Sequence, residues 1–581
     1  MPLPYADTAF TNGYEFTRGT GYVLPEYPFV PPEELTTGKT HRHPVVIVGG
    51  GITGLTLACA LARQGVKAVL LDEDNTVGVK GASSRGICYT QKSLEIFHRL
   101  GVYDPIAAKG VQWSVGRTFA GDDEVYSFDL AQQSAYNLSI QPPFINIQQF
   151  YIEGFLVERI YALGQIDLRW NNRISHFTQN ADYATLTVET PAGSYQIEAD
   201  HVIDATGARS PFRQWCEASI TAKKGDDRWC IADVRFTTHP PVERHTWVEA
   251  PFNENRAVWQ HLMGDEVWRI DYQMAPDADP AYVSQEDVVR ERLMRQFGKD
   301  VGVEIVWVGP YAYRSECIDQ MRHGRVFFMG DSAKVVSPFG ARGGNTGIAD
   351  ADNLAWKLAA VLQGRATPKL LDSYHEERHE AAQQNVLVTN RTARFLRPAD
   401  GVERLFRCAA ISLAKQHLFA RLFVNTGRMA VANPYTRSSI CGTAGGQSVQ
   451  NVAFSWTRGQ AGTKPPRPGA EGVVNDLLQW AAGDLLLLVF GELTPATAQR
   501  LKQLAKHAPV RSVQVLSPGD RAQALEHIWD TNARGVGHLQ GACQASGQAW
   551  ALMRPDGYLA ATGQAVDSQL IAAVEKTLCM H

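Results

Sequence analysis

The 581-residue sequence lacks paired cysteines and blocks of like charge. Its nine cysteines are scattered singly from Cys59 to Cys579, and none forms a CxxC pair or shows metal-ligand spacing. We therefore expect no metal site and no disulfide framework, but free thiols in a reducing compartment. Both signs of charge are interspersed and the formal net charge is -4, so nothing indicates nucleic-acid binding.

Long hydrophobic runs are also missing. In the C-terminal part the longest, Leu485–Phe490, has the length of a strand and is far too short to span a bilayer. The N-terminal MPLPYADTAF has no basic segment before an apolar run, which predicts no signal peptide. We expect a cytoplasmic protein without membrane contact. The chain is too long for one hydrophobic core, so two or three domains are expected.

A glycine-rich turn is present between a predicted strand and a predicted helix. Gly49, Gly51 and Gly54 fit G-x-G-x-x-G, in which the glycines allow a tight turn, close approach of a pyrophosphate and helix–strand packing. The helix N-terminus would offer N–H groups to the phosphates. Asp72 ends the next predicted strand, roughly 20 residues on, and would bind the ribose. Glu73 is its neighbouring alternative. This unit does not distinguish FAD from NAD.

A second motif lies far downstream, in the string GDSAKVVSPFGARGGNTGIADADNLAWKL. Here the chain resembles the single-component (class A) FAD-dependent aromatic hydroxylases, in particular the phenol hydroxylase and 3-(3-hydroxyphenyl)propionate hydroxylase branch, over roughly residues 44 to 400. The family pattern GDAAH, then P-x-G-x-G-x-N, corresponds here to GDSAK followed by Pro338, Gly340, Gly343 and Asn345.

The resemblance implies roles for residues of this motif. Asp331 would bind the ribityl chain of FAD, and Gly340 belongs to the loop that approaches the flavin. Backbone amides near Gly344 and Asn345 would bond the flavin ring. A helix beginning just beyond would direct its positive end there and favour the anionic reduced flavin.

Other residues match or depart from the family pattern. Arg85 corresponds to an arginine that reaches the pyrophosphate and ribityl region, and Gln149 to a glutamine near the ribityl chain. Thr206 stands where the family usually has Asp, a position connected with NAD(P)H, and Lys334 stands where it has His. Arg342 could supply a cation beside the flavin or the hydride donor.

The resemblance also implies a reaction. NADH or NADPH would reduce FAD, O2 would form a flavin C4a-hydroperoxide, and its distal oxygen would pass to a phenolic or other electron-rich small aromatic substrate. No second strand-bracketed GxGxxG occurs, so NAD(P)H would bind in a surface cleft, as in the family. The backbone carbonyl of Pro338 is the expected contact to a ring hydroxyl.

Side chains for substrate binding are expected on the strand that Val267–Met274 predicts. Apolar and polar residues alternate there, which puts Arg269, Asp271 and Gln273 on one face. If this face looks toward the flavin, Arg269 could bind a carboxylate or the flavin, and Asp271 a phenol. Otherwise the face is solvated and carries a surface ion pair. Further candidate proton partners are His261, Tyr311 and Tyr313, although a satisfied core residue is the simpler interpretation of each one.

Two alternatives to aromatic hydroxylation stay open. The first keeps the cofactor and changes the chemistry to Baeyer–Villiger oxidation, epoxidation or decarboxylating hydroxylation of a polycyclic metabolite, because a fold does not fix a function. The second is a non-catalytic FAD-binding protein, for which Thr206 leaves some room. A flavin halogenase is disfavoured because no WxWxIP string occurs.

The expected fold is α/β. A Rossmann-like, glutathione-reductase-like FAD-binding domain would carry an inserted antiparallel-sheet substrate domain and a C-terminal thioredoxin-like domain that lacks CxxC. This last domain would be structural or support a homodimer. The expected divisions are an extended arm (1–43), the first part of the FAD-binding domain (44–214), the substrate-binding sheet (215–320), the second part of the FAD-binding domain with helices (321–440), a linker (441–465) and the thioredoxin-like domain (466–581).

Overall fold

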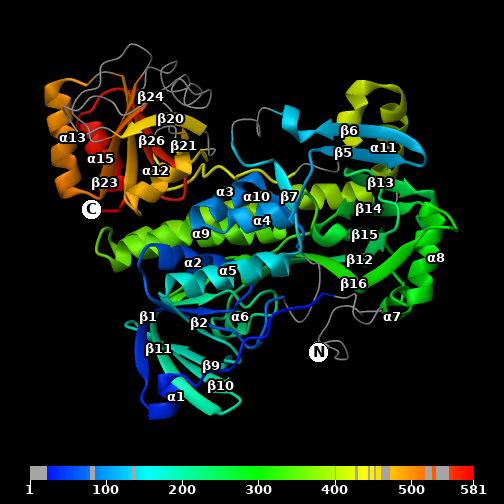
Figure 1. Ribbon diagram of the computed structural model, residues 1–581, viewed down its shortest axis with the longest axis horizontal. Coiled ribbons are helices and arrows are strands. Elements are labelled where there is room, and N and C mark those ends of the chain that lie inside the picture. The colour runs from blue at the N-terminus through cyan, green and yellow to red at the C-terminus, as the bar shows by residue number, and fades with distance from the viewer. Residues whose placement is uncertain are drawn as a thin grey trace.

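The structure is a computed structural model that describes residues 22–78, 86–133, 139–398, 401–424, 429–442, 445–449, 453–458, 471–491, 493–516, 527–530 and 549–580. Three bodies, each built on a large sheet, surround two long central helices, α9 (Gly343–Leu362) and α10 (Asp372–Leu396) (Figure 1). Within these ranges, no helix combines the length and apolar character needed to cross a membrane. The same residues contain no acidic, His or Cys cluster suited to a metal ion.

The first body is an eight-stranded sheet with parallel central strands. β1 pairs in parallel with β2 and β11, β2 with β8, and β11 with β18. The last four residues of β1 are all buried, as expected for a parallel strand covered on both faces. Helices α2 (Ile52–Arg63) and α5 (Gln149–Leu163) cover one face (Figure 1). The strands are β17 (Arg322–His323), β18 (Val326–Phe328), β11 (Gly193–Asp204), β1 (His41–Val48), β2 (Ala68–Leu71), β8 (Ile166–Arg169), β10 (Ala184–Thr190) and β9 (Arg173–Gln179).

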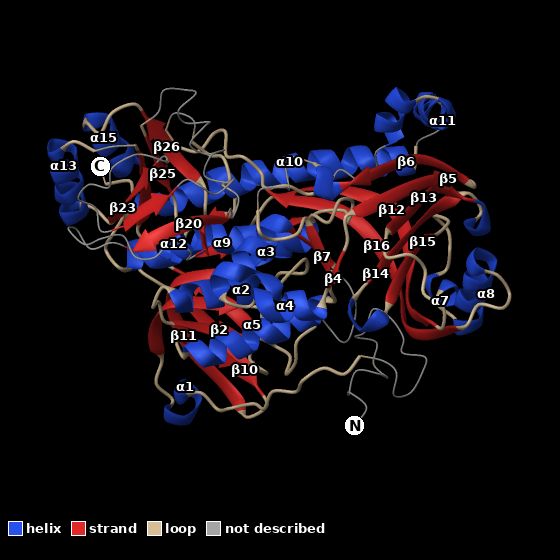
Figure 2. Cartoon of the chain, turned by 45° about the horizontal axis from the view of Figure 1, so that its top comes forward, coloured by secondary structure: helices blue, strands red, loops and turns tan. Residues whose placement is uncertain are grey.

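The second body is a sheet of eight strands, antiparallel except for the parallel pair β13–β5. One face packs its apolar residues against α7 (Pro280–Val283) and α8 (Glu286–Phe297). The opposite face, called here the inner face, looks toward the central helices (Figure 2). In sheet order the strands are β19 (Lys334–Val335), β16 (Val303–Ile318), β12 (Ile220–Phe236), β15 (Trp268–Gln273), β14 (Arg256–Leu262), β13 (Arg244–Ala250), β5 (Val115–Ala120) and β6 (Asp123–Asp129).

This sheet extends beyond the predicted interval 215–320, because β5, β6 and β19 come from outside it. The β5–β6 hairpin adds to the edge strand β13, a pairing over more than 100 residues that no local pattern reveals. A small sheet connects the first two bodies and consists of β3 (Cys88–Thr90), β7 (Phe144–Asn146) and β4 (Val111–Gln112). It is flanked by α3 (Gln91–Leu100) and α4 (Tyr103–Lys109).

The third body contains a seven-stranded sheet and lies beside α9 and α10 at the end opposite the second body (Figure 1). From β22 onward it contains a strand, a helix, a strand, a hairpin and a helix, with β22 parallel to β23 and β25 antiparallel to β26. Its elements are β20 (Ala453–Arg458), β21 (Glu471–Val473), α12 (Val474–Ala481), β22 (Leu485–Phe490), α13 (Pro495–His507), β23 (Val510–Leu516), β24 (His527–Asp530), β25 (Trp550–Met553), β26 (Leu559–Gly563) and α15 (Ser568–Thr577).

Three boundaries differ from the sequence-based expectation. The strand that the sequence predicts at Val45–Val48 begins earlier, at His41 of β1, and β20 lies inside the predicted linker. The apolar pattern predicts a helix over residues 349–362, whereas α9 begins six residues earlier at Gly343, because the first turn of a helix needs no intrahelical N–H bonds and tolerates glycine. The described part of the predicted arm packs on the first body, where Tyr27 stacks on Trp170 with ring centroids 4.5 Å apart.

Candidate cofactor and substrate site

The carboxyl ends of three parallel strands meet at one edge of the first sheet. Val48 of β1 is in register with Asp204 of β11, which is in register with Phe328 of β18. Backbone hydrogen bonds continue past the strands, from Ala205 N to Val48 O at 2.8 Å and from Met329 N to Asp204 O at 3.0 Å. The turn after β1 and the GDSAK segment after β18 are therefore neighbours, at the position where open α/β sheets bind ligands.

The glycine turn after β1 has the geometry that its pattern predicts. Gly49 has a φ of 108°, and a Cβ there would lie 2.5 Å from Ala205 O. A Cβ on Gly54 would lie 2.0 Å from Gly49 O, so helix and turn approach as closely as backbones can. Gly51 is the N-cap of α2 and makes no side-chain cap bond. This cradle fits a pyrophosphate at a helix N-terminus.

Asp72 lies beside the cradle and accepts a hydrogen bond from Gly50 N at 2.5 Å. Burial raises the pKa of this carboxyl to about 7, although the N–H groups of Asp74 and Gly50 oppose the shift. The prediction of an acid at this position thus agrees with the geometry, whereas its neighbour Glu73 is exposed.

Glu153, a carboxylate that the sequence analysis did not single out, completes the turn. It is fully buried on α5, and its Oε1 accepts from Ile52 N at 2.9 Å, the first N–H of α2. Gln149 donates to the same oxygen at 2.8 Å, so its amide acts on the cradle through Glu153. The i, i+4 spacing of Gln149 and Glu153 could have indicated from sequence that these side chains meet on one helix face. Arg85 lies outside the described residues.

Thr53 brings the two motifs together. A Cβ on Gly330 would lie 2.7 Å from Thr53 Oγ1, and one on Gly347 would lie 2.3 Å from the same atom. Only glycine at both positions lets the GDSAK segment and the second turn of α9 lie against the first turn of α2. Two adjacent helix N-termini would thus bind the two ends of one dinucleotide.

The loop before α9 has a strained turn. Pro338 O accepts a hydrogen bond from Ala341 N at 3.1 Å, which leaves its second lone pair for a ring hydroxyl. Gly340 and Ala341 follow with φ of 77° and 57°, and a non-glycine residue there stores strain of the kind found at ligand sites. Gly343 and Gly344 then open α9, and a Cβ on either would meet nothing within 4 Å. A flat ring could therefore approach these amides.

Asn345 fastens this loop through its side chain. Its Oδ1 accepts from Thr90 N at 2.9 Å and from Ser93 Oγ at 2.7 Å. Its Nδ2 donates to Cys88 O at 2.8 Å and to Ala341 O at 2.7 Å. The amide side chain is thus fully used in positioning, and only the backbone N–H in the first turn of α9 could serve a cofactor.

Lys334, which replaces the family's His, is buried in an ion-paired cluster. Its Nζ donates to Asp350, whose carboxylate also accepts from Gly330 N at 2.9 Å and from Arg378 Nε at 2.6 Å. Burial lowers the pKa of Lys334, while Asp350 opposes the shift. Arg378 in turn donates to Thr346 O at 3.2 Å. The cluster therefore ties the GDSAK segment to α9 and α10.

Asp331 and Arg342 have different environments. Asp331 is exposed, and its backbone oxygen accepts from Arg213 Nη2 at 2.9 Å. Arg342 is buried at the N-cap of α9, and its Nη1 donates to Asn385 Oδ1 of α10 at 2.6 Å. The Arg342 guanidinium is thus directed toward α10 by at least one strong contact.

Near Thr206, which stands where the family usually has Asp, the structure contains another carboxylate, that of Asp204. This buried carboxylate accepts from Thr206 Oγ1 at 2.6 Å and from Ser210 Oγ at 2.5 Å. Burial raises the pKa of Asp204, and these hydroxyl bonds oppose the shift. A carboxylate therefore does hold this turn, two residues before the position where the family has it.

The polar face predicted on β15 is buried rather than solvated. Arg269 is 5% and Asp271 2% exposed, and Arg269 Nε donates to Asp271 Oδ1 at 2.9 Å. Asp271 is paired with Trp259 on β14, and the Trp259 ring meets that of Phe339 edge-on at 5.1 Å. The inner face therefore looks onto the strained loop beside α9, and the surface ion-pair alternative is wrong.

Two of the three further proton candidates can be placed. His261 is cross-strand from Arg269 and buried. Burial, Arg244 and Arg269 hold the pKa of its imidazole well below the usual range, so it is neutral at pH 7. Tyr311 is half-buried on β16. The side chain of Tyr313 lies outside the described residues.

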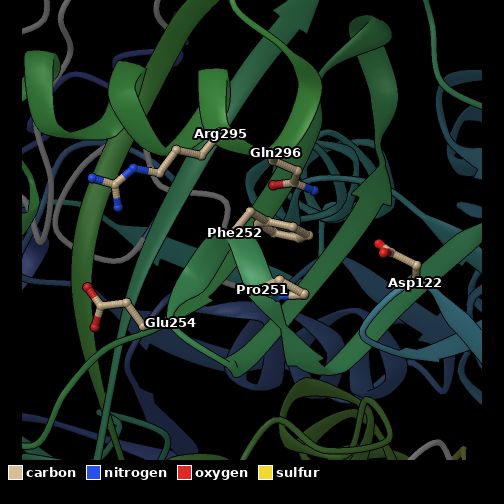
Figure 3. A pocket seen from close by; sticks show the side chains of 6 residues that line it. All are labelled: Asp122, Pro251, Phe252, Glu254, Arg295 and Gln296. Atoms are coloured by element: carbon tan, nitrogen blue, oxygen red, sulfur yellow. The ribbon is translucent and has the colours of Figure 1, made fainter.

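A surface pocket elsewhere shares no residue with this site. Figure 3 shows it on the second body, with Arg295 and Glu254 on one side, Asp122 on the other and Phe252 between them. Arg295 belongs to α8, which covers the outer face of the sheet. The pocket therefore lies apart from the glycine motifs, and we assign no cofactor to it.

The residues present fit FAD. Gly-lined N-termini of α2 and α9 lie together, Asp72 lies beside the glycine turn, and a loop with open Cβ directions opens α9. Gly49, Gly51, Gly54 and Asp72 would hold the adenosine diphosphate end. Residues of the second motif would hold the flavin end.

Comparison with known proteins agrees with FAD as the cofactor. A family model described as FAD binding domain matches residues 42–389. A flavin-dependent monooxygenase of Mycobacteroides abscessus is 31% identical over 367 residues, which cover 61% of this chain and 76% of the relative. A 6-methylpretetramide 4-monooxygenase of Streptomyces rimosus is 27% identical over 544 residues, 90% of each chain. The fold is similar to that of the flavin-dependent monooxygenase PieE, solved with FAD and substrate, with a TM-score of 0.75 at 20% identity over 93% of this chain and 99% of that one.

The family model spans both glycine motifs, and the Streptomyces relative and PieE match most of the chain. NAD(P)H and O2 are the usual co-substrates of such enzymes. The chain therefore belongs to the FAD-binding-domain family of class A aromatic hydroxylases, as a flavin-dependent monooxygenase with FAD as its cofactor.

Proposed function

We propose that this monooxygenase hydroxylates a phenolic or other electron-rich aromatic substrate bound between the inner face of the second sheet and the loop at residues 338–341. The observation that carries the proposal is the burial of Arg269 and Asp271 on the inner face, opposite the loop. A polar pair buried beside aromatic side chains suits a ring with hydroxyl groups.

The chain's own residues would bind the ring and move its proton. Burial raises the pKa of Asp271, against the opposing effect of Arg269, so this carboxylate is a stronger base than an exposed one and could accept a phenol proton. The hydrogen bond from Arg269 holds it in place. The rings of Trp229, Trp259 and Phe339 are almost fully buried and would exclude water. Bound FAD supplies electron transfer from NAD(P)H to O2 and delivery of one oxygen atom.

The test is NAD(P)H oxidation by the purified yellow protein with a panel of phenols and phenolic acids, with hydrogen peroxide measured in parallel. A phenol that accelerates oxidation with little peroxide would support coupled hydroxylation and identify the substrate class. Acceleration with mostly peroxide would indicate an effector. No response to any phenol would contradict the proposal.

A second candidate is Baeyer–Villiger oxidation, epoxidation or decarboxylating hydroxylation of a polycyclic metabolite. The relative that matches over 90% of both chains, a 6-methylpretetramide 4-monooxygenase, favours a larger substrate. Product analysis by mass spectrometry and NMR separates the two candidates. The similarity to flavin-dependent monooxygenases counts against the non-catalytic alternative.

We further propose that the third body is a thioredoxin-like module with a structural role. Its element order and the absence of a CxxC pair support this assignment. A homodimer through this module remains part of the proposal, and sedimentation of the full chain and of a chain ending near residue 465 would test it.

A further inference from the structure

Arg244 is a buried cation that makes no ion pair among the described residues. It is 6% exposed, at the start of β13. Its Nε has no hydrogen-bond partner, and Nη1 donates only to the weak acceptor Met429 Sδ, at 2.9 Å. No ion pair involving Arg244 occurs in the described part of the chain, and burial lowers its pKa, while Cys88 and Asp271 oppose the shift. The Asp271 carboxylate is itself hydrogen-bonded to Arg269. A buried charge without a direct partner is unfavourable, so the Arg244 guanidinium is suited to direct contact with an anion.

Two other unsatisfied polar atoms lie on the same face. Thr246, two residues after Arg244, is cross-strand from Trp259, which puts Arg244 and Trp259 on the inner face. Trp259 Nε1 and His261 Nδ1 are both buried without a partner among the described residues. The Arg244 guanidinium lies 5.8 Å from the Trp259 ring centroid. Three potential donors therefore lie on neighbouring strands of the inner face, and Arg244 is close enough to His261 to lower the pKa of its imidazole.

The remaining charged groups near this region are already engaged. Arg269 is bonded to Asp271, and Asp233, cross-strand from Arg269, accepts from Tyr22 OH at 2.7 Å. Burial raises the pKa of Cys88, the nearest thiol, to about 12, so it stays neutral. Cys88 O also accepts from Asn345, which puts this end of the inner face next to the loop before α9.

We propose that Arg244, with His261 and Trp259 as additional donors, binds an anionic oxygen group of the aromatic substrate. The group is a carboxylate or an ionised ring hydroxyl. The inference rests on the proposed function, since it needs a substrate on the inner face, and it adds the requirement that this substrate is an anion. Arg269 and Asp271 would then serve a different part of the same ring system.

The experiment measures binding to the oxidised holoenzyme without NAD(P)H, by calorimetry and by the change in flavin absorbance. The probes are 3-hydroxy-2-naphthoate, its neutral carboxamide and 2-naphthol. Arg244→Met removes the charge and keeps the stem, Arg244→Lys restores the charge, and Arg256→Met is the control. Arg256 starts the neighbouring strand β14 but pairs with Glu254 at the surface.

Wild-type protein should bind the acid more tightly than the carboxamide. Arg244→Met should weaken binding of the acid roughly 30-fold, as for truncation of one partner in a buried charge pair. Carboxamide binding should change less than about threefold, Arg244→Lys should recover part of the loss, and Arg256→Met should match wild type. If the ionised hydroxyl is the anion, 2-naphthol binding falls in Arg244→Met and loses its increase with pH.

Three results would overturn the proposal. The first is unchanged affinity for the acid and for 2-naphthol in a folded, yellow Arg244→Met protein. The second is a lower flavin midpoint potential with unchanged probe binding, which would make the reduced flavin the anion. The third is a wild-type protein that binds none of the probes. Each is distinct from failure of the proposed function, which NAD(P)H oxidation reports.

Discussion

At the residue scale, Asp72 couples cofactor binding to pH. Its carboxyl has a pKa of about 7 because burial disfavours the charge, and the ribose hydroxyls of FAD would donate to the ionised form. FAD binding therefore releases a proton below pH 7, and affinity should rise roughly tenfold from pH 6 to pH 8. Titration of apoprotein with FAD at several pH values checks this. Asp72→Asn should remove the pH dependence, whereas Glu73→Gln, on the exposed neighbour, should keep it.

Gly49 tolerates no side chain. In Gly49→Ala the new Cβ would clash with Ala205 O, and the φ of 108° is unfavourable for alanine. We expect a loss of about 3 kcal/mol in the free energy of unfolding and a nearly colourless protein. Gly154→Ala is the matched control, because its Cβ would meet nothing within 4 Å in the middle of α5. It should stabilise the protein by up to about 1 kcal/mol. Equal flavin content in both variants would contradict the assignment of the glycine turn after β1 as the pyrophosphate site.

The residues found from sequence and those missed differ in a physical way. Gly49 and Asp72 follow a local rule of spacing within one βαβ unit, so they could be predicted. Glu153 contacts the same turn from α5, about 100 residues later in the sequence. The proposed role of Arg244 depends on the direct partners that it lacks in the folded sheet. Neither property is a pattern along the chain.

At the scale of elements, Asn345 holds the first turn of α9 against β3, the start of α3 and the preceding loop through four hydrogen bonds. Asn345→Ala would leave several buried backbone and hydroxyl groups unpaired. The free energy of unfolding should fall by about 2–4 kcal/mol, and FAD affinity should fall because the loop loses its fixed position. Denaturant unfolding and FAD titration measure the two effects.

The control for this variant is Asn180→Ala. Asn180 is also an amide that accepts two hydrogen bonds, from Asp182 N and Tyr183 N, but it lies in an exposed hairpin turn. We expect less than about 1 kcal/mol of destabilisation there, with unchanged FAD affinity. Similar FAD affinity in both variants would mean that the Asn345 side chain does not position the flavin end.

Element types could be predicted where the apolar period was clear, as for β1 and β15. The boundaries of α9 and β20 could not. The glycines at the start of α9 resemble a loop sequence because glycine has a low helix propensity. The first turn of a helix nevertheless tolerates glycine. β20 lies between stretches rich in glycine and proline that look like a linker, and its partner β24 is far away in sequence.

At the scale of the whole molecule, the third body is joined to the central helices by a buried ionic network. Arg554, at the end of β25, donates to both oxygens of Glu377 on α10, at 2.5 and 2.9 Å. Glu377 also accepts from Lys357 Nζ of α9 at 2.7 Å. Burial alone would raise the pKa of Glu377, but Arg554 and Lys357 hold it well below the usual range.

Breaking this network should loosen the whole protein. Arg554→Met should lower the free energy of unfolding by about 3–5 kcal/mol, because it removes one partner of a buried pair. Arg511→Met, in a half-exposed pair with Asp484 on the same body, should change it by less than about 1 kcal/mol. Thermal unfolding of both variants checks the difference. The network also predicts acid sensitivity: since the folded-state pKa of Glu377 is depressed, its contribution is present above pH 4.5 and is lost as pH falls further.

The pairing of β1 with β11 and of β11 with β18 has a consequence for biosynthesis. Roughly 280 residues separate Val48 from Phe328, and a ribosome adding 5–20 residues per second needs on the order of half a minute to make them. During that time the apolar end of β1 lacks its sheet, and the flavin half of the cradle does not exist. The nascent chain should therefore acquire its yellow colour only late in translation, and any fragment that stops before Phe328 should remain an apoprotein in need of chaperones.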